Sequence, residues 1–153
     1  MSVLNDLVAF RKALFGLKVD RTTAALPQTT QSALFTVAGG RVLITSIVGE
    51  VTTVIQTQAN NTKIVSNPTT GTDVDLCAVL DITADQVGCL YGITGLFSDA
   101  MVGANAGATV VPRNAAVVPV GTIDLSCAAS NTGSVKWSIT YVPLDDGASV
   151  TAA

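Results

Sequence analysis

The chain has 153 residues, enough for one domain with a core, and 48% of them are hydrophobic while only 12% are charged. This charged share is about half that of an average globular protein. Much of the surface must therefore consist of Thr, Ser, Asn, Gln, Gly and Ala. Such a surface loses its bound water easily when it packs against another protein. Four basic and two acidic side chains give residues 1–21 a net charge of +2. Four basic and nine acidic side chains give residues 22–153 a net charge of −5. This distribution lacks the dense basic stripe of a nucleic-acid-binding protein, and the 5% share of aromatic residues is low for a stacking site.

The N-terminal residues predict a short helix followed by an arm. Apolar side chains recur at spacings of four and three over residues 3–17, which is typical of one helix face, and Ser2 is placed to cap it. Such a short helix is marginal alone, so the stripe must pack on the domain, on symmetry mates or on a partner. The period ends at Lys18, and residues 1–33 are therefore predicted to form a helix and extended arm. The interaction residues expected here are Val3, Leu7, Phe10, Arg11, Lys12, Leu14, Leu17, Lys18 and Arg21. The basic ones either meet an acidic protein surface or form a solvated helix face.

From Leu34 onward the sequence predicts strands. Val, Ile and Thr are enriched, with turn signals every 8–15 residues. Hairpins are predicted around Gly39-Gly40 and across residues 131–133. On the last long strand, Val135, Trp137, Ile139 and Tyr141 point to one side, which indicates core packing more than a sugar-stacking face. The fold class predicted is all-β, an antiparallel sandwich or jelly-roll-like barrel over residues 34–147, followed by a flexible tail at 148–153.

The cysteines and the chain ends bear on the compartment. Cys77, Cys89 and Cys127 form no C-x-x-C pair, and their odd number suits no closed disulfide framework. Two of them lie in apolar, strand-like runs, which suggests buried thiols. The first sixteen residues lack the pattern of a secretory signal, and no run of about 18 apolar residues could span a membrane. We therefore expect assembly in a reducing cytoplasm, without a membrane partner.

The sequence contains no histidine, which excludes Ser-His-Asp and Cys-His catalysis and most zinc and copper sites. Pairs of carboxylates are the remaining route to catalysis or to a hard cation. Three pairs are present, and each lies at a predicted turn, where aspartate is expected for structural reasons. We predict no catalytic residue, cofactor, metal, nucleic acid or small-molecule substrate. The pairs are Asp73 with Asp75, Asp81 with Asp85, and Asp145 with Asp146.

Three phrases of the β region, ALFTVAGGRVLITSIVGEVTT, TDVDLCAVLDI and VVPVGTIDLSCAASNTGSVKWSITYVPLDDGA, carry a resemblance that covers most of residues 33–148. The chain resembles small virion proteins of tailed bacteriophages, and is most similar to capsid decoration (cement) proteins. Such proteins typically form trimers of β-rich subunits on the capsid and use an N-terminal arm to engage the lattice or a neighbour. The resemblance implies a homotrimer on the virion surface that stabilises the capsid by self-association and by binding the major capsid protein. A phage tail or fibre component and a receptor- or glycan-binding module are the alternatives.

Overall fold

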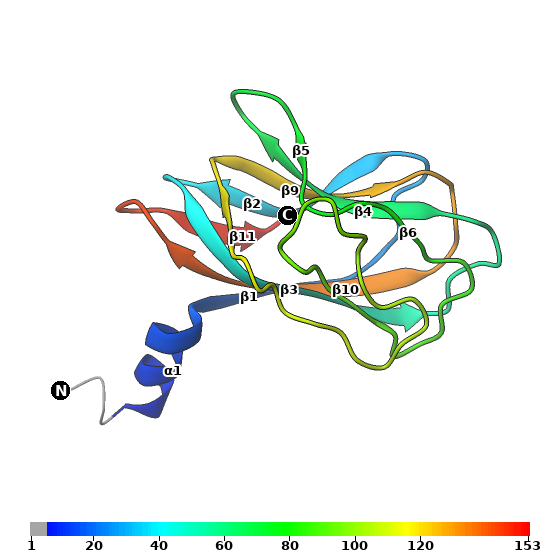
Figure 1. Ribbon diagram of the computed structural model, residues 1–153, viewed down its shortest axis with the longest axis horizontal. Helices are drawn as coiled ribbons and strands as arrows, with labels where there is room; N and C mark the ends of the chain where they lie inside the picture. The colour runs from blue at the N-terminus through cyan, green and yellow to red at the C-terminus, as the bar shows by residue number, and fades with distance from the viewer. Residues whose placement is uncertain (1–5) are drawn as a thin grey trace.

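The computed structural model describes residues 6–153 as two antiparallel β-sheets packed face to face, with a single helix outside them (Figure 1). The first sheet has the strand order β1-β10-β3-β7, with β8 also paired to β3, and the second has the order β11-β2-β9-β4-β5, with β6 also paired to β4. The predicted all-β sandwich with a short N-terminal helix is confirmed. The elements are α1 (Leu7–Phe15), β1 (Leu17–Ala25), β2 (Gln31–Ala38), β3 (Val42–Thr53), β4 (Asn61–Pro68), β5 (Val74–Asp75), β6 (Leu80–Asp81), β7 (Leu90–Tyr91), β8 (Ala116–Val118), β9 (Gly121–Cys127), β10 (Ser134–Pro143) and β11 (Ser149–Ala152).

The core lies between the two sheets, and β10 shows how the sequence pattern builds it. Val135, Trp137, Ile139 and Tyr141 are all buried while the side chain of Lys136 is exposed, which confirms the predicted alternation. Side chains of successive strand residues point to opposite faces, so one face of β10 is apolar and the other solvated.

The two predicted hairpins are wrong. Strand β2 pairs with β9 and β11, whereas β3 pairs with β10, β7 and β8, so the two strands on either side of Gly39 and Gly40 belong to different sheets. Strands β9 and β10 are likewise in different sheets. Both connections cross from one sheet to the other, because a tight turn ends a strand without specifying the sheet that the next strand joins.

The predicted boundary between an arm at 1–33 and a body at 34–147 is also wrong. Strand β1 pairs with β10 from Leu17, opposite Tyr141, to Ala25, opposite Ser134. The sandwich therefore begins at residue 17. Of the described part of the predicted arm, α1 projects from the sheets, and residues 26–30 connect β1 to β2. The expected tail at 148–153 is in fact strand β11, which pairs with β2 and buries Val150.

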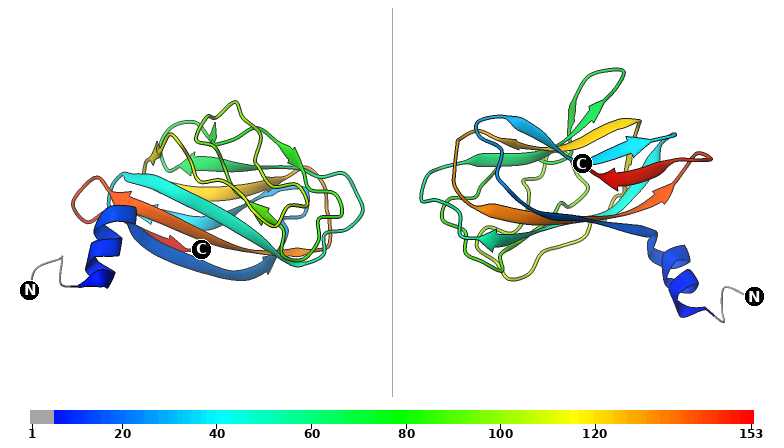
Figure 2. Two further views of the ribbon diagram at one scale, coloured as in Figure 1. Left: turned by 60° about the horizontal axis from the view of Figure 1, so that its bottom comes forward. Right: turned by 180° about the vertical axis from the view of Figure 1, so that it is seen from behind.

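The two edges of the sandwich differ. At one edge β1 and β11 approach each other, and the Nε of Arg21 donates a hydrogen bond of 3.2 Å to the carbonyl of Ala153. At the other edge β8 and β5 face one another beside the long segment of residues 92–115. The views in Figure 2 show α1 projecting beyond the sandwich where β1 begins. The helix and the β8–β5 edge thus belong to opposite sides of the fold.

Candidate assembly surface

Helix α1 begins and ends at defined residues. The carboxylate of Asp6 accepts hydrogen bonds from the backbone N–H groups of Val8 and Ala9 at 2.9 and 3.1 Å, which is the N-cap interaction that satisfies otherwise unpaired donors. Asp6 therefore caps the helix, and the predicted cap Ser2 lies outside the described residues, as does Val3. The backbone N–H of Gly16 closes the last turn by donating to Lys12 at 2.8 Å.

One residue joins the helix to the sandwich. Gly16 has a φ of +91°, and a Cβ at this position would collide with the backbone carbonyl of Tyr141, so only glycine is accommodated. The hydroxyl of Thr45 lies 2.9 Å from the carbonyl of Phe15 and 3.0 Å from that of Thr140, and its one proton serves both acceptors. Leu17 is already paired in the sheet. The base of the helix is therefore held against β10 and β3.

The rest of the helix touches almost nothing. None of its residues is buried, and the side chains of Leu7 and Leu14 are 80% and 59% exposed. Phe10 is also exposed, so three residues of the predicted stripe lie uncovered on the helix. The prediction is wrong for Leu17, which is in β1 and packs partly against the core. Val8 and Phe15, seven residues apart, add a second exposed apolar row, which lies outside the heptad positions of the predicted stripe. A helix that is apolar on most of its circumference is normally a buried helix.

The predicted basic residues divide into two groups. Arg11 and Lys12 are exposed on α1, and with Lys18 they help to line a crevice of about 430 Å³ between the helix and the sheet. Lys18 also forms an exposed ion pair with Asp20 at 2.9 Å, a kind of contact that contributes about 0–1 kcal/mol. Arg21, on β1, is bound to the C-terminal residue, so Arg11 and Lys12 are the basic side chains of the helix that remain accessible to a partner.

A second apolar feature lies at the open edge of the sandwich. Between β8 and β5 there is a groove of about 320 Å³, which we call the edge groove. Its exposed apolar side chains are Val74, Phe97 and Val117, and the buried side chains of Leu76 and Val118 also line it. Because Phe97 comes from an irregular loop without a periodic pattern, no sequence signal marked it.

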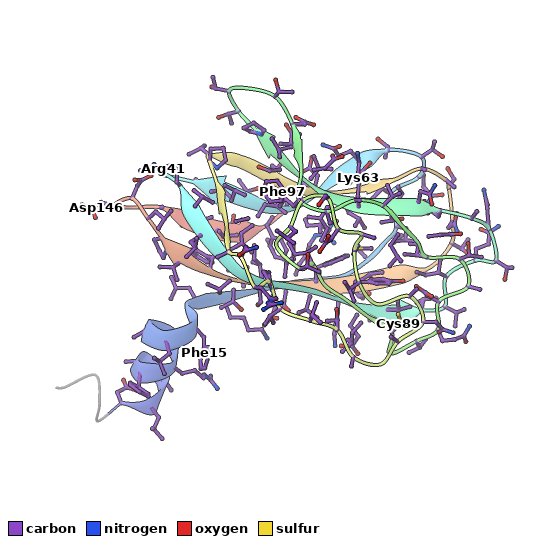
Figure 3. The ribbon with its side chains drawn as sticks, in the orientation of Figure 1. Phe15, Arg41, Lys63, Cys89, Phe97 and Asp146 are labelled. Atoms are coloured by element: carbon purple, nitrogen blue, oxygen red, sulfur yellow. The ribbon has the colours of Figure 1, made fainter. Side chains whose placement is uncertain are left out.

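The aromatic residues separate clearly into core and surface, and all seven lie in the described part of the chain. Trp137 and Tyr141 are buried, as predicted. The exposed ones are Phe10, Phe15 and Phe97, two on the helix and one in the edge groove. Figure 3 labels Phe15 on α1 and Phe97 on the body, well separated from one another.

The aspartates at 81 and 85 have separate structural roles. The carboxylate of Asp81 accepts hydrogen bonds from the Thr83 hydroxyl at 2.6 Å and from the backbone N–H of Asn60 at 2.9 Å, and these contacts lower the pKa of Asp81. Asp85 is buried and accepts a 2.6 Å hydrogen bond from the hydroxyl of Tyr91. Burial, and then this hydrogen bond, raise the pKa of Tyr91. The two carboxylates thus hold different segments of chain.

Two of the other paired aspartates bind basic side chains. Asp75 forms an ion pair with Lys63 at 2.7 Å. Asp145 accepts from the backbone N–H, Nε and Nη2 of Arg41 at 2.7, 2.9 and 2.7 Å, which holds the pKa of Asp145 well below its usual range. Within residues 6–153 no three His, Cys, Asp or Glu side chains are placed to hold a metal ion.

The three cysteines are free and buried, whereas the sequence predicted burial for two of them. Burial raises the pKa of each thiol, at Cys77, Cys89 and Cys127. The thiol of Cys89 donates to the carbonyl of Gly103 at 2.8 Å. Neutral, buried thiols are poor nucleophiles, so these side chains serve as small core residues.

Comparison with known proteins identifies no relative: no family model, curated protein or solved structure matches the chain. Among residues 6–153, no helix has the length and apolar character needed to cross a membrane. The uncovered helix and the edge groove are the main surface features of the described residues that could bind a partner.

Proposed function

We propose that the chain is a structural protein of a bacteriophage virion, which decorates and stabilises the capsid by self-association and by binding the major capsid protein. The observation that carries the proposal is the exposed apolar surface of α1, on a helix that is capped at Asp6 and anchored at Gly16. A helix of nine residues gains little stability by itself, and most helical stability in proteins comes from packing an apolar face.

The energetics favour a partner for this helix. Fully burying a leucine or phenylalanine side chain is worth about 1.5–3 kcal/mol. In the single chain Leu7, Leu14 and Phe15 are more than half exposed, and Phe10 is 37% exposed. A protein surface that covers them recovers several kcal/mol, which is enough to offset part of the cost of association. Contiguous apolar surface of this kind marks interaction sites.

The remainder of the molecule suits a structural role. The body is a two-sheet sandwich, and the chain has a low share of charged residues, so its faces are easily desolvated when subunits pack. Placement on a phage capsid is proposed from the resemblance of residues 33–148 to small virion proteins. The proposed division of labour is that α1 attaches to the lattice or to a neighbour, while the body from Leu17 onward packs and associates.

The experiment that tests this function uses purified full-length chain and capsid shells that lack it. We expect an oligomer, a trimer above all, when molar mass is measured by light scattering, and saturable binding to the shells. The variant Leu7→Ser/Leu14→Ser is expected to lose binding but keep its circular dichroism spectrum, because both side chains are exposed in the single chain. A stable monomer that does not bind the shells would falsify the proposal.

The position of the protein in intact particles decides between capsid and tail. Gold-labelled antibody against the body should decorate the shell if the proposal holds. Label confined to the tail would instead make the chain a tail or fibre component that uses the same helix. Both outcomes are read directly from electron micrographs of purified particles.

A further inference from the structure

We infer that helix α1 of one copy binds in the edge groove of a second copy of the same chain. This inference rests on the proposed function, because it names the contact through which the protein self-associates. Each copy has both the helix and the edge groove. The same helix-to-groove contact can therefore link one subunit to the next. Helix binding in an apolar groove is a common mode of recognition, with anchors spaced by three, four and seven residues, and Leu7, Phe10 and Leu14 have that spacing.

The two surfaces match in chemistry and size. The exposed aromatic side chains of the molecule are confined to these two places, with Phe10 and Phe15 on the helix and Phe97 in the groove. The groove has a volume of about 320 Å³, whereas an apolar cavity of about 150 Å³ is enough to hold a benzene molecule. The groove therefore has room for two anchor side chains of the helix.

The topology excludes the simplest alternative, in which the helix covers the groove of its own chain. Helix α1 continues directly into β1, at one edge of the first sheet, while β8 lies at the opposite edge with β10 and β3 between them. Gly16 and the Thr45–Phe15 hydrogen bond hold the base of the helix at the β1 side. The edge groove of a neighbouring copy, by contrast, can contact the helix without any change in the fold of either chain.

Charge also favours this pairing. Arg11 lies on the same side of the helix as Leu7 and Leu14, four residues after one and three before the other. Among the described residues, none that lines the groove is charged, so the attraction is between the helix and the acidic body as a whole. Residues 1–21 carry +2 and the remainder −5, so the helix of one copy is attracted to the body of the next, which orients the encounter.

Pairing between helices is the alternative contact. A coiled coil through Leu7, Phe10 and Leu14 would bury a single seam and would leave the exposed Val74, Phe97 and Val117 of the edge groove uncovered. The helix-to-groove contact joins two different surfaces, so it generates a closed ring when the rotation between subunits closes and a filament when it does not.

The test uses two single-cysteine additions that are mixed under mild oxidation. One protein carries Leu14→Cys on the helix and the other carries Val117→Cys in the groove; both positions are exposed in the free chain, and the native thiols are buried. A disulfide requires Cα atoms within about 4.4–6.8 Å of each other, so a mixed dimer on a non-reducing gel reports direct contact. The matched control pairs Leu14→Cys with Val54→Cys, which has comparable exposure but lies outside the groove.

The expected result is a mixed dimer with Val117→Cys and none with Val54→Cys. A disulfide formed mainly between two Leu14→Cys chains would overturn the inference in favour of paired helices. An oligomer by molar mass that gives no crosslink at Val117→Cys would overturn the inference and leave the proposed function standing. A chain that stays monomeric at every concentration and does not bind capsid shells would overturn both the inference and the proposed function. Failure of the inference alone is therefore distinguishable from failure of the proposed function.

Discussion

Truncation of Leu14 to alanine tests whether the exposed helix α1 contributes to association between subunits. The side chain is 59% exposed, so its removal should not alter the stability of the single chain. Since complete burial of a leucine is worth about 1.5–3 kcal/mol, covering its exposed part is worth about 1–2 kcal/mol in each contact. The dissociation constant of the oligomer should therefore rise about 5- to 30-fold, at 1.4 kcal/mol for each factor of ten.

The body supplies a matched control, because Val87 is also 59% exposed but lies in a loop away from both α1 and the edge groove. We expect Val87→Ala to leave the dissociation constant unchanged. Sedimentation equilibrium over a range of concentrations measures the constant, and thermal unfolding of dilute, monomeric protein measures stability. Equal dissociation constants for Leu14→Ala and Val87→Ala, or a lower melting temperature of the Leu14→Ala monomer, would contradict a role of Leu14 in association.

Three further predictions concern the fold. Gly49→Ala places a Cβ 2.8 Å from the facing indole ring, so overpacking should cost about 1–3 kcal/mol in urea unfolding; an unchanged midpoint would contradict this packing. Tyr91→Phe removes the hydroxyl that donates to buried Asp85, at a cost of about 1–3 kcal/mol by the same assay, and a neutral effect would show that the hydrogen bond is unimportant. Arg41 lowers the pKa of Asp145, so their ion pair stabilises the fold above about pH 4 and loses this effect as pH falls. The difference in midpoint between the parent and Asp145→Asn should therefore shrink between pH 6 and pH 2; a constant difference would argue against it.

The sequence predicted the sandwich because its strongest signal was a local alternation. Trp137 and Tyr141 alternate with polar neighbours, and the sheet-forming period of two then places both in the core. The same local signal did not specify sheet membership. Gly39 and Gly40 mark the end of a strand equally well whether the next strand pairs in the same sheet or crosses to the other.

The edges of the sandwich were the least predictable part. In β1, Lys18 and Asp20 are exposed while Leu17 and Val19 pack partly against the core, so the strand contributes only one face and its polar residues resemble an arm. Strand β11 was missed for the same reason. Of the candidate site, the exposed stripe of α1 was predicted from spacing, whereas Phe97 becomes a surface feature only when the loop carries it to the β8–β5 edge.

The joint at Gly16 gives the helix a fixed direction. Flexible linkers let their ends wander by about 5–6 Å times the square root of the number of residues, but here a single residue separates a hydrogen-bonded helical turn from a paired strand. A partner bound to α1 is consequently held at a set angle to the sandwich, and little orientational freedom remains to be lost on binding. The angle of this joint, more than the affinity of the helix, would then determine how many subunits complete a ring.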